Sequence, residues 1–321
     1  MKTVLVTGAA GFIGSNLTKA LLEKGYRVAG VDNFDDTYDL RFKELNIAPF
    51  QDNANFKLER IDIRDEDALK TVFETEKPSY VVHLAGKADT RKAVQTPRLY
   101  TSVNIDGSLN ILELCREYPV ENLVIASSSS VYGNSSQVPF TEDQPADRPI
   151  SPYGATKRAV EHLAHTYHHN FSMNIVCLRY FNAHGENNRP GMVPYVWAEK
   201  LLKGEDIEIS GDGSRKRDYT YIGDIVRGTI SAMEKPLGFE IVNLGNNTPI
   251  SLNELLAIFE KVIGTKAKVN SRPSHGASVE VTYADITKAK KLLDWEPKVS
   301  LEEGITRLVA WFRANRLKES K

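Results

Sequence analysis

The chain has little cysteine, no long apolar run and almost no net charge, and each absence excludes a class of protein. Two cysteines among 321 residues, Cys115 and Cys177, cannot form the disulfide framework of a small secreted domain. Buried free thiols instead suit a reducing compartment. No apolar stretch approaches the roughly 20 residues of a membrane span. A net charge of −1 gives no general attraction to nucleic acid or to an acidic membrane surface.

The N-terminus lacks the apolar segment of a signal peptide, because Met1 and Lys2 lead into only a brief apolar run before the first glycine. The sequence also has no internal repeat and no low-complexity linker. We therefore expect a cytoplasmic protein whose partner is a small molecule, not nucleic acid or a membrane. With 321 residues the chain is long enough for two domains and a large core.

A glycine-rich segment near the N-terminus predicts a dinucleotide-binding loop. The apolar run at residues 3–6 is followed by the spacing Gly8-x-x-Gly11-x-x-Gly14, and helical periodicity begins at Ile13. Backbone N–H groups at a helix N-terminus attract an anion, and glycines let a phosphate approach them closely. A plain strand–turn–helix unit has the same pattern, so the assignment needs a second residue.

That second residue is Asp32, which ends the next apolar run at residues 28–31. It lies about 20 residues after the glycine loop, where a ribose-binding carboxylate is expected. A carboxylate there accepts hydrogen bonds from both ribose hydroxyls of NAD and repels the additional phosphate of NADP. The sequence therefore predicts NAD as the cofactor.

Strand and helix patterns alternate as far as about residue 181. Strands expected at residues 56–61, 80–85, 123–126 and 175–178 are separated by helical patterns. This alternation predicts an α/β fold, a Rossmann-like doubly wound parallel sheet with ligands at the carboxyl ends of its strands. We expect an NAD-binding domain over residues 1–181 and a smaller C-terminal substrate-binding α/β domain over 182–321. Part of 219–248 is expected to rejoin the first domain.

Tyr153 and Lys157 form a candidate acid–base pair. They are four residues apart in the helix predicted after Pro152, so both side chains lie on one face. Tyrosine has an ordinary pKa of about 10, and a neighbouring ammonium group favours its phenolate. Ser128, which ends a predicted strand, could hydrogen-bond the same substrate oxygen. A Tyr-x-x-x-Lys spacing also occurs by chance. His83, inside a buried strand, is interpreted as a core histidine.

In these motifs the chain resembles the extended short-chain dehydrogenases/reductases, and within them the NAD-dependent sugar epimerases and dehydratases. The likeness covers nearly the whole chain and is carried by residues 7–14, 62–63, 83–85, 104, 127–133, 153–157, 179–182 and 217–219. The resemblance implies an isomerase that binds NAD and a UDP-sugar and forms a homodimer.

The resemblance also implies roles for individual residues. It implies catalysis by Ser128, Tyr153 and Lys157. The residues implied to contact NAD are Gly8, Gly11, Phe12, Ile13, Gly14, Asp32, Asn33, Asp62, Ile63, Leu84, Ala85, Gly86, Asn104, Tyr153 and Lys157. Those implied to contact the nucleotide sugar are Ser127, Ser128, Ser129, Tyr153, Asn182, Arg189 and Arg217. An Arg217 contact to the pyrophosphate makes independent sense, because a guanidinium binds phosphate with two parallel hydrogen bonds. No metal site is expected.

Two serines in this motif favour epimerisation over dehydration. Sugar 4,6-dehydratases that resemble this chain carry an Asp-Glu pair just before the segment corresponding to 131–133. Here those positions are Ser129 and Ser130, which cannot supply the acid–base chemistry of an elimination. Related decarboxylases usually have a glutamate in this run, which is also absent. The resemblance therefore implies an NAD-dependent UDP-sugar 4-epimerase that oxidises C4 transiently and returns the hydride to the other face.

Among the epimerases, the likeness is strongest to those acting on UDP-glucuronate, through residues 33–39, 127–130 and 148–153. Three departures keep UDP-glucose and UDP-N-acetylglucosamine open as substrates. The UDP-glucuronate enzymes tend to have threonine where Asn182 stands and an aromatic residue where His184 stands, and residues 273–278 lack a usual Gly-Asp. Asn182 is typical of epimerases of neutral UDP-hexoses. A non-catalytic NAD-sensing protein is a further alternative, which the intact Ser-Tyr-Lys set disfavours.

Overall fold

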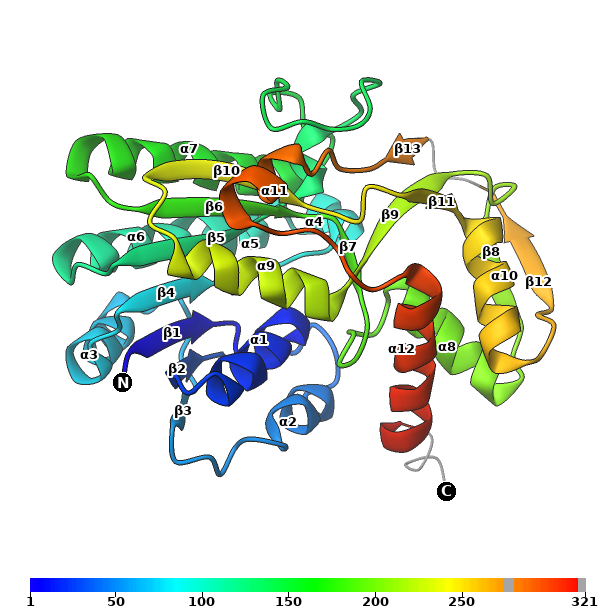
Figure 1. Ribbon diagram of the computed structural model, residues 1–321, viewed down its shortest axis with the longest axis horizontal. Helices are drawn as coiled ribbons and strands as arrows, with labels where there is room; N and C mark the ends of the chain where they lie inside the picture. The colour runs from blue at the N-terminus through cyan, green and yellow to red at the C-terminus, as the bar shows by residue number, and fades with distance from the viewer. Residues whose placement is uncertain (274–279, 317–321) are drawn as a thin grey trace.

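The structure is a computed structural model that describes residues 1–273 and 280–316. Its largest element is a sheet of seven parallel strands, which Figure 1 shows beside a smaller group of strands and helices. The strands in spatial order are β10 (Phe239–Leu244), β6 (Ile175–Tyr180), β5 (Asn122–Ser128), β4 (Tyr80–His83), β1 (Thr3–Thr7), β2 (Arg27–Val31) and β3 (Phe56–Glu59). The predicted doubly wound parallel sheet is confirmed.

The order of the strands fixes where a ligand can bind. The chain winds outward from β1 through β2 to β3, then returns to the other side of β1 with β4 and continues to β5 and β6. In such sheets the crevice lies beyond the carboxyl ends of the strands, at the point where the winding reverses. That point is between β1 and β4, so the glycine loop after β1 faces the segment 84–86 after β4.

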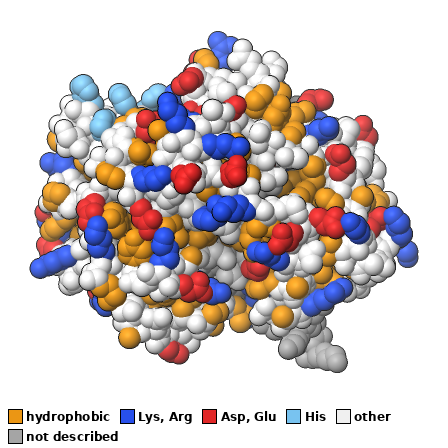
Figure 2. Space-filling view, viewed as in Figure 1, with side chains coloured by type: hydrophobic (Ala, Val, Ile, Leu, Met, Phe, Trp, Pro, Cys, Tyr) orange, Lys and Arg blue, Asp and Glu red, His pale blue; other side chains and the backbone are white. Residues whose placement is uncertain are grey.

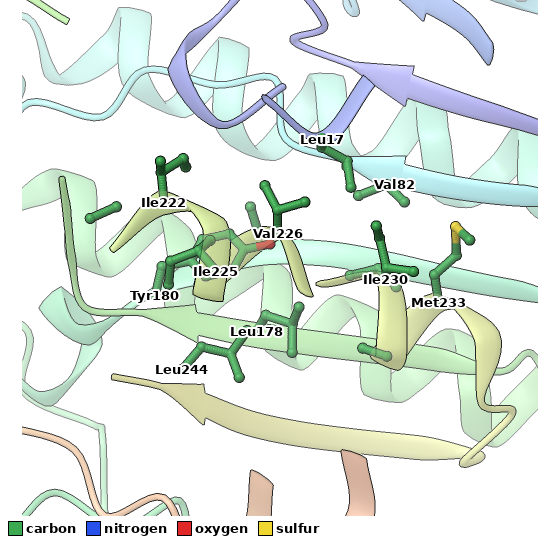
Figure 3. Close-up of a cluster of buried hydrophobic side chains, with 14 of the residues drawn as sticks. Leu17, Val82, Leu178, Tyr180, Ile222, Ile225, Val226, Ile230, Met233 and Leu244 are labelled. Carbon is green, nitrogen blue, oxygen red and sulfur yellow. The ribbon is translucent and has the colours of Figure 1, made fainter. Parts of the chain in front are cut away.

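Helices cover both faces of the sheet because the strand residues alternate between two apolar clusters. Val4 and Val6 face one cluster and Leu5 faces the other. The first face is covered by α1 (Phe12–Glu23), α2 (Arg41–Ile47), α9 (Ile222–Glu234) and α11 (Thr287–Leu293). The second is covered by α3 (Glu66–Glu76), α6 (Gly107–Glu117) and α7 (Pro152–Phe171). Figure 3 shows the first cluster, with Ile225 of α9 and Leu178 of β6 among the side chains packed together.

The smaller group has its own strands and its own core. One of its sheets contains β11 (Pro249–Ser251), β9 (Lys216–Tyr221), β13 (Val281–Thr282) and β7 (Asn182–His184). A second contains β8 (Ile207–Ser210) and β12 (Val269–Arg272). The helices α8 (Val193–Lys203), α10 (Leu252–Ile263) and α12 (Leu301–Asn315) enclose a core that includes Trp197, Phe259 and Phe312. Ser251 and Glu254 cap α10 reciprocally.

We propose that the chain divides into the two domains expected from the sequence, and the contacts between its elements support this division. Within residues 219–248, α9 packs on α1 and β10 extends the large sheet. The strand β9, which ends at Tyr221, belongs to a sheet of the smaller group. A later segment, α11, also packs on β10 and α9. The C-terminal region therefore returns to the first domain twice.

Three segments differ from or lie beyond the sequence-based expectations. The helical pattern between the strands expected at 80–85 and 123–126 is not one helix, since it includes α5 (Pro97–Thr101), a π-helical turn at Ser102–Asp106 and α6 in succession. The helix α4 (Thr90–Gln95), capped by Asp89, was not predicted. Of the departure noted at 273–278, residues 274–278 lie outside the described residues.

The surface and the helices fit the composition. Figure 2 shows lysines and arginines intermixed with aspartates and glutamates over the face that it draws, consistent with a net charge of −1. Across residues 1–273 and 280–316, no helix combines the length and apolar character that a membrane crossing requires.

Candidate active site

A cavity of about 660 Å³ opens at the carboxyl ends of the strands and brings the predicted site residues together. The residues predicted to bind the cofactor that line it are Gly8, Gly11, Phe12, Ile13, Gly14, Asp32, Asn33, Asp62, Ile63, Leu84, Ala85, Gly86, Tyr153 and Lys157. The predicted substrate residues on its walls are Ser127, Ser128, Ser129, Asn182, Arg189 and Arg217. Among the predicted residues, all of them described, Asn104 alone is not on its walls.

The glycine loop is shaped to hold a phosphate. Gly8 has a φ of +73°, which side chains other than glycine rarely adopt, and a Cβ there would lie 2.9 Å from the Ala85 backbone nitrogen. A Cβ at Gly14 would lie 1.9 Å from the Gly8 carbonyl oxygen. The loop leads into α1, whose N-cap Gly11 has no side chain to occupy the first N–H groups. These features fit the diphosphate of a dinucleotide.

Asp32 is held by more groups than the sequence indicated. Its carboxylate accepts hydrogen bonds from the backbone N–H groups of Phe34 (2.9 Å) and Ala10 (3.1 Å). It also pairs with the Lys43 ammonium at 2.9 Å, and both side chains are almost completely buried. Lys43 lines the cavity too, and no motif in the sequence identified it. Its positive charge weakens the repulsion that Asp32 alone would exert on a ribose phosphate.

Asp62 and Asn33 lie side by side on the same wall of the cavity. The Asn33 amide donates to the Asp62 carboxylate at 2.9 Å. Arg64 binds the same carboxylate with both nitrogens of its fork, at 2.9 and 2.8 Å, and holds the pKa of Asp62 well below its usual range. Asp62 is therefore ionised at neutral pH. Among the described residues, no group of three or more His, Cys, Asp or Glu side chains is arranged to bind a metal ion.

Tyr153 and Lys157 of α7 both reach the cavity beside Ser128. Burial raises the pKa of Tyr153, while the Ser128 hydroxyl and the positive charge of Arg189 lower it. The Lys157 ammonium donates a hydrogen bond to the Ala126 carbonyl at 2.8 Å, at the end of β5. Burial lowers the pKa of Lys157 to about 8. Lysine is thus anchored to the strand that carries Ser128.

The hydroxyls of the serine run have different partners. Ser127 donates to the Glu161 carboxylate at 2.5 Å and also lines the cavity, where the resemblance implied a contact to the substrate. Ser128 accepts from the Ser130 backbone N–H at 3.1 Å. No described residue is hydrogen-bonded to the hydroxyls of Ser129 and Ser130, which begin the 3₁₀ turn at Ser129–Tyr132 and line the cavity.

Two buried side chains support the site from behind. Asn104, in the π-helical turn, exchanges hydrogen bonds with the backbone of Lys87 at 2.8 and 3.0 Å and donates to the Thr156 hydroxyl at 3.0 Å. It therefore fixes the loop after β4, where the resemblance implied a contact to the cofactor. His83 contacts the hydroxyls of Thr7 and Ser108, and burial lowers its pKa to about 3. Both features suit a core histidine.

Besides Arg64, which is paired with Asp62, three arginines line the cavity. Arg189 donates to the Ala88 carbonyl at 2.8 Å. Arg217 of β9 donates to its neighbour's carbonyl, and burial lowers its pKa. Arg91 also lies on the wall. Arg91 is not among the residues predicted from the sequence, because it belongs to α4, a helix that was not predicted either. Three guanidinium groups around one cavity can bind a substrate diphosphate.

Comparison with known proteins places this arrangement in a family. The family model described as GDP-mannose 4,6-dehydratase matches residues 5–308. The chain belongs to this family of NAD-dependent epimerases and dehydratases. It is 47% identical over 312 residues to the UDP-glucuronate 4-epimerase of Thermodesulfobacterium geofontis, with 97% of this chain and 96% of that protein covered.

Two solved structures have the same fold over nearly their whole length. The UDP-glucuronic acid 4-epimerase of Bacillus cereus, in complex with UDP-glucuronic acid and NAD, has a TM-score of 0.92 at 36% identity, covering 97% of this chain and 99% of that one. The UDP-glucose 4-epimerase of Thermotoga maritima, with UDP-glucose, has a TM-score of 0.90 at 34% identity, with the same coverage. The family and the fold predicted from the sequence are confirmed.

Proposed function

We propose that this protein is an NAD-dependent UDP-sugar 4-epimerase that interconverts UDP-glucuronate and UDP-galacturonate. The observation that carries the proposal is a single cavity with three kinds of wall: the glycine loop and Asp32, the Ser128–Tyr153–Lys157 set, and the three arginines. The first fits a dinucleotide, the second a proton transfer, and the third a diphosphate. The two solved epimerases support this combination. The Bacillus cereus structure contains UDP-glucuronic acid and NAD, and the Thermotoga maritima structure contains UDP-glucose.

The residues of the site supply the proton transfer. Tyr153 takes the proton of the substrate C4 hydroxyl, and the Ser128 hydroxyl, which already lowers the pKa of Tyr153, stabilises the same oxygen. NAD held by the glycine loop and Asp32 would supply reversible hydride transfer at C4. Arg91, Arg189 and Arg217 hold the diphosphate while the 4-keto sugar turns over, so hydride returns to its opposite face. The reaction produces no net oxidation.

Two positions of the motif argue against dehydration. Elimination after oxidation requires an acid and a base near C5 and C6, and Ser129 and Ser130 stand where related dehydratases have Asp and Glu. The hydroxyl of serine is too weak an acid and too weak a base for that task. The family model carries a dehydratase name, but these two residues favour epimerisation.

A uronate substrate imposes a further requirement on the site. Oxidation at C4 makes a β-keto acid, which loses CO₂ when its carboxylate bond aligns with the ketone π system. An epimerase must hold the carboxylate in another orientation. Ser129, Ser130 and Asn182 are on the cavity wall, and no described residue is hydrogen-bonded to their side chains, so three donors are available. Charge-assisted hydrogen bonds to a carboxylate are stronger than neutral ones.

UDP-glucose or UDP-N-acetylglucosamine is the second candidate substrate. The observation that favours it is Asn182 itself, a residue typical of epimerases of neutral UDP-hexoses. Its amide can orient a neutral hydroxymethyl group as well as a carboxylate. The similarity to the Thermotoga maritima UDP-glucose 4-epimerase agrees with this alternative. A non-catalytic NAD-sensing protein is disfavoured, since all three catalytic side chains line the cavity.

One reaction panel followed by NMR tests the proposal. Purified protein with added NAD receives UDP-glucuronate, UDP-glucose or UDP-N-acetylglucosamine. We expect UDP-galacturonate with little UDP-pentose, at a higher kcat/KM than for UDP-glucose. Exclusive turnover of the neutral sugars would contradict the carboxylate argument. Extraction of bound cofactor in the same preparation tests NAD against NADP, and equal affinity for both would remove the role given to Asp32.

Asn182→Leu separates the two candidate substrates. Leucine has a similar volume but cannot donate a hydrogen bond. A hydrogen bond to a charged group contributes about 1.5–3 kcal/mol, which corresponds to roughly ten-fold or more in kcat/KM. We expect that loss with UDP-glucuronate and a smaller loss with UDP-glucose.

We also propose that the protein acts in the cytoplasm. Cys115 and Cys177 are buried free thiols, which a reducing compartment maintains.

A further inference from the structure

Glu161 is a buried carboxylate behind the site that the mechanism above does not use. It lies on α7 one turn after Lys157, and its side chain is 1% exposed. It accepts the Ser127 hydroxyl at 2.5 Å and two hydrogen bonds of 2.8 Å each from the Arg179 guanidinium on β6. It also accepts from Arg158 at 2.8 Å. One side chain therefore connects α7 to the carboxyl ends of both β5 and β6.

These contacts end beside the reacting groups. Ser127 lies between Ala126, whose carbonyl binds the Lys157 ammonium at 2.8 Å, and the catalytic Ser128. A shift of this strand end relative to α7 would move Ser128 away from Tyr153. A displacement of about 1 Å at a reacting group can lower a rate by about 100-fold. The geometry gives Glu161 control over the distance between the strand and the helix.

The cluster around Glu161 contains more positive than negative charges. Arg158, Arg179 and Lys157 are cations, and Glu161 is the carboxylate that faces all three. Burial opposes the ionisation of Glu161. The hydrogen bonds and charge of Arg179, together with the hydrogen bonds of Ser127 and Arg158, outweigh burial and lower the pKa of Glu161. Glu161 is therefore ionised. The negative charge of Glu161 favours the charged form of Lys157, whereas burial disfavours it.

We propose that Glu161 is a positioning residue for epimerisation, which fixes the Ser127–Ser128 end of β5 against α7 and places a buried negative charge one helical turn from Lys157. The inference rests on the proposed function, because its test uses turnover. Arg179 stabilises the arrangement from the other side, where its guanidinium lies over the Tyr132 ring at 4.7 Å from the centroid. This second contact holds the arginine that binds Glu161.

Several ionisable groups besides Glu161 face Lys157. They are His83 of β4, Cys177 of β6, and Tyr153 and Arg158 of α7. Arg179 of β6 contacts Glu161 instead. His83 and Cys177 are uncharged at neutral pH, since burial lowers the pKa of the first to about 3 and raises that of the second. At neutral pH, Glu161 is therefore the group whose charge favours the protonated form of Lys157 against burial.

The pH profile of kcat tests the proposal with variants that act in opposite directions. Glu161→Gln keeps the shape but removes the negative charge, so the pKa of Lys157 falls. We expect the alkaline limb of kcat to move to lower pH by several tenths of a unit, with kcat reduced roughly ten-fold and KM little changed. Arg158→Gln leaves the charge of Glu161 less compensated and should move the same limb to higher pH.

Two further variants separate geometry from charge. Ser127→Ala removes the hydrogen bond between Glu161 and β5 but keeps the charges of Glu161 and Lys157. We therefore expect kcat to fall while the alkaline limb of the pH profile stays in place. Glu76→Gln is the matched control: Glu76 is a similarly buried carboxylate, paired with Arg27 and Lys57 on β2 and β3, away from the cavity. It should lower the melting temperature and leave the pH profile unchanged.

The outcomes distinguish this proposal from the proposed function. The assay uses the UDP-sugar that the wild type converts best, so the substrate preference does not matter. If Glu161→Gln and Arg158→Gln leave the alkaline limb in place, or move it in the same direction, the positioning role is wrong and Glu161 only stabilises the fold. If Glu161→Gln does not fold, the Arg158→Gln and Ser127→Ala profiles still decide. A wild type that converts no UDP-sugar would overturn the proposed function, and this inference with it.

Discussion

Tyr153 has 8% of its surface exposed, and one edge contact with the Tyr100 ring, at 6.4 Å between centroids, fixes its orientation. Burial makes the phenolate costly, so the free protein holds Tyr153 as a neutral phenol. Ser128 and Arg189 reduce that cost. A positively charged cofactor beside the ring would reduce it further. This residue-scale balance explains why a tyrosine can act as a base near neutral pH only within the assembled site.

Tyr153→Phe should abolish turnover, because the variant loses only the ionisable oxygen. We expect kcat to fall by at least about 100-fold, the lower end for general base catalysis. Affinity for the nucleotide sugar, measured by calorimetry, should stay within a few-fold. Tyr100→Phe is a suitable control, since it keeps the ring that contacts Tyr153. Near-normal activity of the Tyr153 variant would refute the mechanism.

His184 is fully buried between the rings of Tyr219 and Tyr221, and a Cβ on Gly304 would touch its ring. Neither ring nitrogen has a hydrogen-bond partner among the described residues. Burial lowers the pKa of His184 to about 3. An aromatic side chain without nitrogens, such as phenylalanine, would avoid the unpaired polar atoms.

His184 should make the fold sensitive to acid. The unfolded chain protonates this histidine near pH 6.5 and the folded protein only near pH 3, so protons favour the unfolded state between these values. The free energy of unfolding is therefore expected to fall as pH decreases below 6.5, by about 1.4 kcal/mol per pH unit from this residue.

Urea unfolding of His184→Phe between pH 6.5 and 5 measures that contribution. The slope of the free energy of unfolding against pH should decrease by about one proton. His169→Phe, at an exposed position of α7, serves as the control and should leave the slope nearly unchanged. An unchanged slope in the His184 variant would show that this histidine does not resist protonation in the folded protein.

At the scale of elements, the unit formed by β1, the glycine loop and α1 is organised around close backbone contacts. The Gly11 N–H bonds the Gly8 carbonyl at 3.0 Å, and the Gly8 N–H bonds the Val31 carbonyl of β2 at 2.7 Å. Gly14 allows α1 to begin directly against this loop. The strand, the loop and the helix therefore form one rigid support for a phosphate.

Gly14→Ala should abolish NAD binding, because its Cβ would lie 1.9 Å from the Gly8 carbonyl oxygen and force the loop to move. We expect the loss of cofactor retention and of the melting-temperature increase on adding NAD. Gly264→Ala is the control: it ends α10, nothing lies within 4 Å of its Cβ, and its left-handed φ costs about 1 kcal/mol. The control should lower stability and still bind NAD, and equal binding by both variants would contradict the fit of the loop.

At the scale of the whole molecule, the resemblance implies a homodimer. The candidate surface is on α6 and α7, where Leu109 and Phe171 are exposed by 36% and 49%. Other apolar residues of α6 and α7, including Leu112 and Val160, are buried against the sheet. The exposed residues are therefore additional to those that the fold needs, as an interface across a twofold axis would require.

Light scattering at micromolar concentration should give twice the mass of one chain. Leu109→Asp, at an exposed position of α6, is expected to shift the protein toward monomer. Val269→Asp on β12 of the smaller group, where Val269 is 44% exposed, should leave the mass unchanged. A monomeric wild type would refute the pairing of these helices.

The sequence determined the elements whose signals are local. Gly8, Gly14 and Asp32 follow from the spacing of one strand–loop–helix–strand unit, and Tyr153 with Lys157 from a four-residue spacing on one helix. The helix α10 likewise has its two buried apolar residues four positions apart, which is the spacing of one helix face. Such patterns are readable because each depends on neighbours within a few turns of the same chain.

Only the tertiary structure decided which polar groups meet. Lys43 pairs with Asp32, and Ser127 is engaged by Glu161, because separate elements bring their side chains together after folding. The π-helical turn that directs Asn104 to Lys87 has no local signature, since it depends on the contacts of that side chain with the loop after β4. Local pattern specifies the backbone of the site, whereas the partner of each charge depends on distances between segments far apart in the chain.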